Sequence, residues 1–115
     1  MAATDVTIYH NPRCATSRKV LALLRSRGIE PRVVEYLKTP PDAAELKRLV
    51  KLLGIAPHAL LRKKEAKEAG LDKLTSDDAL IAALAKHPIA IERPIVVKGN
   101  RAALGRPPEA VTKIL

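Results

Sequence analysis

The amino-acid sequence predicts an α/β fold with a central four-stranded mixed sheet, flanking helices and a helical insertion. The chain opens with strand, helix and strand, continues with a run of helical segments, and ends with two strands and a short helix. Its 115 residues include no stretch with the composition of a linker, and 47% of them are hydrophobic, which is enough for one packed core. We therefore expect a single domain over residues 1–115.

The first third of the chain predicts two strands joined by a helix. Residues 6–9 are β-prone, and the turn signal Asn11-Pro12 follows them. An apolar stripe indicates a helix over about 16–27, which Gly28 ends, and residues 32–37 are typical of a second strand. A strand, a helix and a strand at this spacing predict a right-handed crossover between two parallel strands.

The middle of the chain predicts several helices in succession. Either Thr39 or Asp42 caps the first of them, with Pro40 and Pro41 inside its first turn and Gly54 at its end. Short helical pieces are expected over about 57–62 and 65–69. A longer helix is capped within residues 75–78 and ends at residues 87–88.

The last third changes to strand signals. Residues 94–97 and 101–104 flank Lys98-Gly99-Asn100 and predict a β-hairpin. Residues 105–108 then lead into a short final helix that ends near Leu115. The full order is β-α-β, then helices, then β-β-α, which is the order of the thioredoxin-like architecture.

Cys14 is the only thiol of the chain, and it stands in the turn between the first strand and the first helix. A helix N-terminus and the neighbouring Arg13, Arg18 and Lys19 are features that stabilise a thiolate, which is a nucleophile. The alternative is a buried structural cysteine, which is common. With no second cysteine to close an internal disulfide, a redox cycle must take its second thiol from another molecule.

Two neighbours of the thiol have both a chemical and an ordinary interpretation. Ser17 completes a Cys-x-x-Ser pattern, and its hydroxyl can donate a hydrogen bond to a thiolate or simply belong to the start of the helix. His10 can form an ion pair with the thiolate, relay a proton, or lie on the surface of the loop. Thr16 is equally consistent with a cap, and Asn11 with a role in shaping the turn.

Three arginines stand next to chain-breaking or apolar signals: Arg62 after two leucines, Arg93 before Pro94, and Arg106 before two prolines. Each by itself is typical of a surface charge. In a thioredoxin-like topology, however, the loop before the third strand carries a cis-proline beside the thiol, and Pro94 occupies that place, so Arg93 is expected near Cys14. A cluster of guanidinium groups is a receptor for a tetrahedral oxyanion, because each planar fork binds two oxygens.

The formal net charge of +9 allows nucleic acid, anionic lipid or a small anion as a partner. The chain has two tyrosines and no Phe or Trp, so stacking on nucleic-acid bases is poorly supported. The sequence shows no Cys/His spacing for a metal, no glycine-rich phosphate loop, no membrane span and no cleaved signal. A single cysteine and no signal predict a cytoplasmic protein.

Taken together, these segments resemble the glutaredoxin-coupled arsenate reductase family over nearly the whole chain. The matching blocks are Ile8-Tyr9-His10-Asn11-Pro12-Arg13-Cys14, Thr16-Ser17-Arg18, Tyr36-Leu37, Pro40-Pro41, Leu60-Leu61-Arg62, His87-Pro88-Ile89, Arg93-Pro94-Ile95-Val96-Val97 and Gly105-Arg106-Pro107. Ala15 stands where well-studied members carry glycine, and the chain ends at Leu115 where they continue. The sequence is therefore similar to a shorter branch of the family.

The resemblance implies a function and a role for each site residue. Cys14 would attack arsenate to give a thiol-arsenate adduct. Three arginines, Arg62, Arg93 and Arg106, would hold the oxyanion, and His10 and Ser17 would tune the cysteine. Glutathione, a co-substrate rather than a bound cofactor, would attack the adduct, and glutaredoxin would resolve the mixed disulfide.

Two other functions remain open on the sequence. One is a glutathione-dependent thiol oxidoreductase that acts on another substrate and needs Cys14 but not all three arginines. The other is a non-catalytic regulatory or binding protein, which the positive charge supports. The family includes regulators that bind RNA polymerase, but they typically carry Cys-x-x-Cys, and Ser17 replaces the second cysteine.

Overall fold

The computed structural model describes residues 5–115, and their contacts form two compact units. Within the described residues, one unit comprises 5–39 together with Arg93–Leu115, and the other comprises Pro40–Glu92. Each unit is described here by itself. The expectation of one domain over residues 1–115 stays a prediction.

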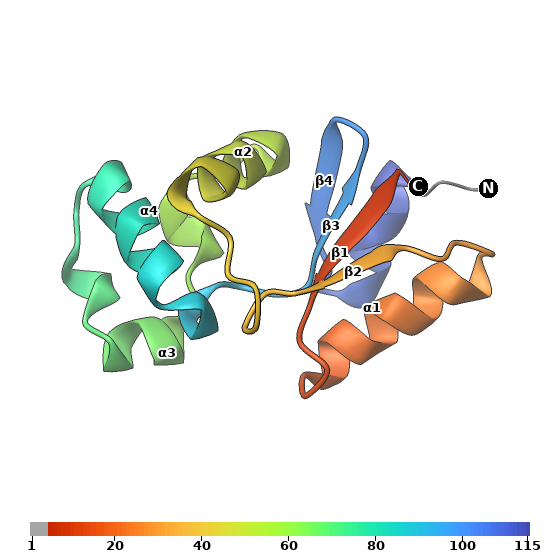
Figure 1. The fold of residues 1–115 in the computed structure, drawn as a ribbon, viewed down its shortest axis with the longest axis horizontal. Coiled ribbons are helices and arrows are strands. Elements are labelled where there is room, and N and C mark those ends of the chain that lie inside the picture. Colours follow the sequence, from red (N-terminus) through yellow and green to blue (C-terminus); the bar gives the residue numbers. More distant parts are fainter. Residues whose placement is uncertain (1–4) are drawn as a thin grey trace. The chain divides into compact units, whose positions relative to one another are not determined.

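The first unit is built on a four-stranded sheet in the order β2-β1-β3-β4 (Figure 1). Strands β1 and β2 are parallel, with Ile8 opposite Val33. The pairs β1–β3 and β3–β4 are antiparallel, with Ile8 opposite Val96 and Val96 opposite Ala103. This confirms the predicted mixed sheet, whose strands are β1 (Val6–His10), β2 (Arg32–Glu35), β3 (Ile95–Lys98) and β4 (Arg101–Leu104).

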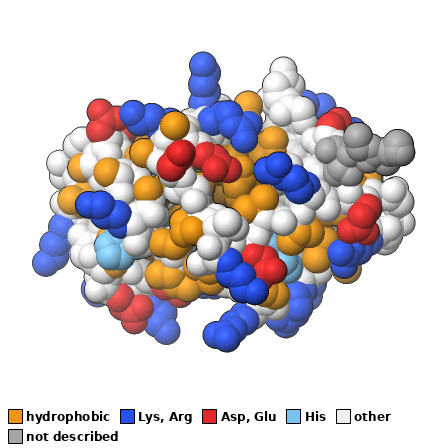
Figure 2. All heavy atoms as spheres, viewed as in Figure 1, with side chains coloured by type: hydrophobic (Ala, Val, Ile, Leu, Met, Phe, Trp, Pro, Cys, Tyr) orange, Lys and Arg blue, Asp and Glu red, His pale blue; other side chains and the backbone are white. Residues whose placement is uncertain are grey.

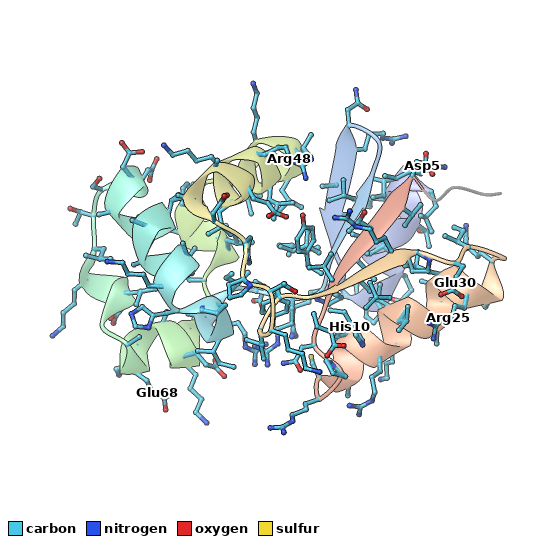
Figure 3. All side chains as sticks on the ribbon, viewed as in Figure 1. Asp5, His10, Arg25, Glu30, Arg48 and Glu68 are labelled. Atoms are coloured by element: carbon cyan, nitrogen blue, oxygen red, sulfur yellow. The ribbon has the colours of Figure 1, made fainter. Side chains whose placement is uncertain are left out.

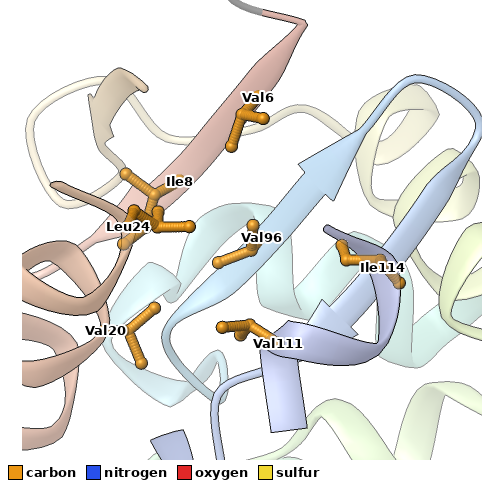
Figure 4. Packing of buried hydrophobic residues seen from close by; sticks show 7 residues of the cluster. All are labelled: Val6, Ile8, Val20, Leu24, Val96, Val111 and Ile114. Atoms are coloured by element: carbon orange, nitrogen blue, oxygen red, sulfur yellow. The ribbon is translucent and has the colours of Figure 1, made fainter. Parts of the chain in front are cut away.

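One face of the sheet is covered by helix α1 (Ala15–Ser26) and by η4 (Pro108–Ile114). Figure 4 shows the aliphatic cluster between them, which the absence of Phe and Trp requires. The short final helix that the sequence predicted is η4, a 3₁₀ helix with proline in its first turn. The cluster consists of Val6, Ile8, Val20, Leu24, Val96, Val111 and Ile114.

The end of α1 follows the sequence prediction closely. Gly28 adopts φ 76°, a left-handed conformation that favours glycine because it has no Cβ. Its N–H donates to the carbonyl of Arg25, and the N–H of Ile29 donates to the carbonyl of Leu24, so two carbonyls at the helix end are satisfied. The chain then enters β2.

The regular elements of the second unit are all helices, apart from an isolated bridge between Leu61 and Ile91, which confirms the predicted helical insertion. Asp42 caps its first helix by accepting from the N–H of Glu45 at 2.8 Å, so both prolines precede the cap and do not lie in the first turn as predicted. Its elements are α2 (Ala43–Leu53), η1 (Pro57–Leu60), α3 (Lys63–Glu68), η2 (Leu71–Lys73), α4 (Asp77–Lys86) and η3 (Pro88–Ala90).

Positive charge is spread over the visible face of the protein and does not gather in one patch (Figure 2). Within residues 5–115, no helix is long and apolar enough to cross a membrane. In the same range, no group of three or more His, Cys, Asp or Glu side chains is placed to hold a metal ion.

Candidate active site

Cys14 is the N-cap residue of α1 and is half-buried. The turn that delivers it is fixed by Asn11, whose side-chain oxygen accepts from the N–H of Arg13 at 3.0 Å and whose carbonyl accepts from the N–H of Cys14 at 3.0 Å. Asn11 therefore shapes the turn, as the sequence predicted. The extended backbone of Cys14 places its sulfur beside the free N–H groups at the start of the helix.

The pKa of Cys14 is set by opposing effects. Burial raises it, but the backbone N–H of Ser17 and the guanidinium of Arg93 stabilise the thiolate, with a smaller contribution from the N–H of Thr16. The net result is a pKa of Cys14 below its ordinary value. The sequence predicted a contribution from the helix N-terminus, and the N–H groups of Ser17 and Thr16 agree with it. It also named Arg13, Arg18 and Lys19, but the cation that lowers the pKa of Cys14 is Arg93, far along the chain. Arg18 instead donates to the carbonyl of Pro12 at 2.8 Å.

The side chains of Arg93 and Arg106 both lie next to the thiol of Cys14. The peptide bond between Arg93 and Pro94 is cis, which confirms the prediction for this proline. Nε of Arg106 donates to the carbonyl of Arg93 at 2.9 Å, and Nη2 of Arg106 lies 3.9 Å from Sγ of Cys14. Two guanidinium groups therefore surround the sulfur within one unit.

A second cis bond, between Arg106 and Pro107, carried no signal in the sequence. Gly105, just before it, was not predicted as part of the site either. A Cβ at Gly105 would lie 2.6 Å from Cγ2 of Val20 and 2.8 Å from Cγ of Pro94. Only a residue without a side chain lets the strand end pass between helix α1 and the cis-proline loop.

His10 and Ser17 form a buried pair. His10 is 5% exposed and Ser17 is fully buried, so the interpretation of His10 as a surface imidazole is wrong. Nδ1 of His10 lies 2.6 Å from Oγ of Ser17, which also accepts from the N–H of Asn11 at 3.1 Å. Figure 3 shows His10 at the end of β1 nearest to the start of α1.

The surroundings of His10 lower the pKa of its imidazole and so favour the neutral form. Burial lowers its pKa most, and the positive charges of Arg25 and Arg18 lower it further, whereas Glu35 partly opposes them. A neutral imidazole hydrogen-bonded to a serine can orient that serine and hold its proton, but it adds no positive charge to the site. Ser17 acts on the thiol through its backbone N–H, and its hydroxyl faces His10.

Arg62 belongs to the second unit, where it is the N-cap residue of α3. Its Nε lies 3.3 Å from Oε1 of Glu65, its Nη1 lies 3.4 Å from Oε1 of Glu92, and its N–H donates to the carbonyl of Ala90 at 2.8 Å. The guanidinium is thus held between two carboxylates. Its predicted role as an oxyanion ligand stays a prediction.

The comparisons with known proteins cover nearly the whole chain. A model of the ArsC family matches residues 9–114. The chain is 51% identical to an uncharacterized protein, YfgD, of Escherichia coli K12, over 96% of this chain and 97% of that one. It is 48% identical to an arsenate reductase of Neisseria meningitidis serogroup A, over 96% and 98% of the two chains. A solved arsenate reductase from Vibrio cholerae superposes with a TM-score of 0.92 at 51% identity, over 99% of this chain and 100% of that one.

Proposed function

Because the chain belongs to the ArsC family, we propose that it reduces arsenate to arsenite with Cys14 as the nucleophile. The observation that supports this most directly is the thiol with a lowered pKa between Arg93 and Arg106. Two relatives named arsenate reductases, 48% and 50% identical over 98% and 82% of their own length, point to the same substrate.

The first step forms a bond between sulfur and arsenic. The Cys14 thiolate attacks the As(V) centre, and one arsenate oxygen leaves as water after protonation. The developing negative charge on the remaining oxygens is stabilised by guanidinium groups that are already in place. Arg93 and Arg106 are the proposed ligands, and Arg62 is the third if its carboxylate partners yield to the oxyanion.

The second step transfers two electrons. Glutathione attacks the adduct, arsenic is reduced to As(III), and the two sulfurs that supplied the electrons form a disulfide between Cys14 and glutathione. Glutaredoxin then resolves this disulfide, and arsenite is released. Glutathione enters as a co-substrate, and the need for reduced thiols supports a cytoplasmic location.

His10 and Ser17 are proposed as positioning residues. Their hydrogen bond and the bond from Asn11 to Ser17 join the end of β1 to the start of α1, on either side of Cys14. They are expected to keep the helix N–H groups aimed at the sulfur.

The test is arsenate-dependent oxidation of NADPH in a system coupled through glutathione reductase and glutaredoxin. We expect turnover with the wild-type chain and none above background with Cys14→Ser. Arg93→Lys keeps the positive charge but replaces the planar guanidinium with an ammonium group, so the KM for arsenate should be higher than that of wild type. Wild-type turnover no faster than that of Cys14→Ser would refute arsenate reduction.

The two carboxylates on the guanidinium of Arg62 give some support to a second function, a glutathione-dependent thiol oxidoreductase that acts on another substrate and does not need all three arginines. The guanidinium of Arg62 is already paired with Glu65 and Glu92, whereas Arg93 and Arg106 lie beside the sulfur of Cys14. Reduction of a glutathionylated substrate that survives Arg62→Ala and Arg106→Ala, without arsenate turnover, would favour this function.

A further inference from the structure

An open cavity of about 550 Å³ lies along α1. Its lining begins at the end of β1 and continues along the helix, as His10 and Arg25 in Figure 3 indicate. Three of its seven lining side chains are apolar, and the other four are polar or charged. The residues that matter here are His10, Pro12, Arg18, Leu21, Ala22 and Arg25.

The lining residues of α1 share one face of the helix. Arg18, Leu21, Ala22 and Arg25 recur at intervals of three and four, so they form a continuous row. Cys14 stands four positions before Arg18 and begins the same row. At a rise of 1.5 Å per residue, the row extends about 16 Å from Cys14 to Arg25.

The charges of this row all have one sign. The 12 residues of α1 include Arg18, Lys19 and Arg25 but no Asp or Glu. Arg18 is anchored by its bond to the carbonyl of Pro12. Arg25 is held by Glu30 through a bidentate pair, with donor distances of 3.2 Å from Nε and 3.1 Å from Nη2, and the two side chains are 51% and 71% exposed, so a carboxylate of a partner must displace Glu30 from this arginine.

We propose that this cavity is the docking surface for the protein thiol that regenerates Cys14. The docked partner presents carboxylates to Arg18 and Arg25 and an apolar side chain to Leu21 and Ala22. This inference rests on the proposed function, in which each cycle leaves Cys14 joined to glutathione.

The length of the row favours a protein over glutathione itself. A tripeptide extends at most about 11 Å, and the sulfur of glutathione is on its central residue, so it reaches only about half that distance beyond the sulfur. A ligand that reacts at Cys14 and also contacts Arg25 must span about 16 Å along the helix. A protein surface meets this requirement, and its carboxylates would also increase the rate of encounter with a basic chain.

The reaction at the docked surface is a thiol–disulfide exchange. The partner's thiolate attacks the sulfur of the bound glutathione, the bond between that sulfur and Cys14 breaks, and Cys14 leaves as a thiolate. The partner then carries glutathione in a new disulfide, so no other oxidant or reductant is needed. The lowered pKa of Cys14 makes it a good leaving group in this step.

The test starts from the full chain with Cys14 converted to its glutathione disulfide and uses no arsenate. The rate of reduction is measured with an acidic glutaredoxin and, separately, with dithiothreitol, and the ratio of the two rates is compared among variants. We expect Arg25→Glu and Ala22→Glu each to lower this ratio by about tenfold, and added salt to narrow the effect of Arg25→Glu. Circular dichroism verifies that each variant is folded.

Arg27→Glu is the matched control. Arg27 is an exposed cation two positions after Arg25, at the C-cap of the same helix, and it does not line the cavity. Its substitution makes the same change in charge, so the ratio should stay within about twofold of wild type.

The proposal would be overturned if the ratio of the glutaredoxin rate to the dithiothreitol rate were equal for Arg25→Glu and Arg27→Glu, or if Arg25→Glu and Ala22→Glu kept the ratio of wild type. It would also be overturned if free glutathione reduced the wild-type disulfide as fast as glutaredoxin does. Absence of arsenate turnover would count against the proposed function alone, because this measurement contains no arsenate.

Discussion

Nδ1 of His10 lies 2.6 Å from Oγ of Ser17 inside the protein, and this contact ties the last residue of β1 to the first turn of α1. The same hydroxyl accepts from the N–H of Asn11. The hydroxyl of Ser17 therefore holds together the two ends of the turn that carries Cys14. The backbone N–H of the same residue, Ser17, stabilises the thiolate of Cys14. Ser17 thus links the stability of the fold to the reactivity of the sulfur.

Ser17→Ala is expected to destabilise the protein by about 2 kcal/mol, because it leaves the buried imidazole of His10 and the N–H of Asn11 without their partner. The measurement is urea unfolding at neutral pH. Ser26→Ala is the control, since Ser26 is exposed on the same helix and its hydroxyl only donates to the carbonyl of Leu23. A loss no greater than that of Ser26→Ala would show that the contact between His10 and Ser17 contributes nothing to stability.

Acid should destabilise the protein through His10. Its folded pKa lies below the ordinary value near 6.5, so the unfolded chain binds a proton more readily than the folded chain. The stability due to the neutral imidazole is therefore fully present above that ordinary pKa and is lost as the pH falls toward the folded pKa. We expect the free energy of unfolding to fall from pH 7.5 to pH 5.5.

His10→Gln should reduce this dependence on pH, whatever its cost at pH 7.5. Urea unfolding at both values of pH gives the slope for wild type and variant. His58→Gln, which removes an exposed imidazole, is the control for the loss of a histidine. An undiminished slope in His10→Gln would mean that other groups cause the acid sensitivity.

The sequence predicted the sheet, the first helix and the place of Pro94, because apolar period and turn residues are local signals. It predicted the helix N-terminus and, from the expected fold, the proximity of Arg93 to Cys14, but it could not show that the cations next to Cys14 in the sequence are not the ones that lower its pKa. Arg13 and Lys19 are neighbours of Cys14 in the sequence, but Arg93 is the arginine that lowers its pKa, since the end of the sheet brings the loop before β3 to the start of α1.

Contacts between distant segments account for the other differences. The sequence around Gly105 does not indicate that Val20 and Pro94 leave no room for a Cβ there, because these residues are distant along the chain. Likewise, Arg62 carries the same motif signal as Arg93 and Arg106, but its carboxylate partners, Glu65 and Glu92, become visible only when the helical unit is folded.

Arg93→Ala is expected to raise the pKa of Cys14, because it removes both a hydrogen bond to the thiolate and a positive charge near it. The rate of alkylation by iodoacetamide, measured from pH 5 to pH 10, gives the midpoint directly. The midpoint of wild type should lie below about 8.5, and that of Arg93→Ala should be higher, with several-fold slower alkylation at pH 7. Arg13→Ala is the control for a cation that is close only in sequence. Equal midpoints for wild type and Arg93→Ala would remove Arg93 from the activation of the thiol.

Gly105→Ala is expected to reduce stability and activity together. Its new Cβ would overlap Cγ2 of Val20 and Cγ of Pro94, and overpacking of this kind costs about 1–3 kcal/mol. Because Pro94 follows Arg93 and Gly105 precedes Arg106, relief of the overlap must shift the two guanidinium groups around Cys14, so turnover should fall more than the loss of folded protein explains. Val20→Ala makes room on one side, so the double variant should unfold at a higher urea concentration than the sum of the two single effects predicts. Strictly additive effects would show that the strand end moves away from α1 and does not press on Val20.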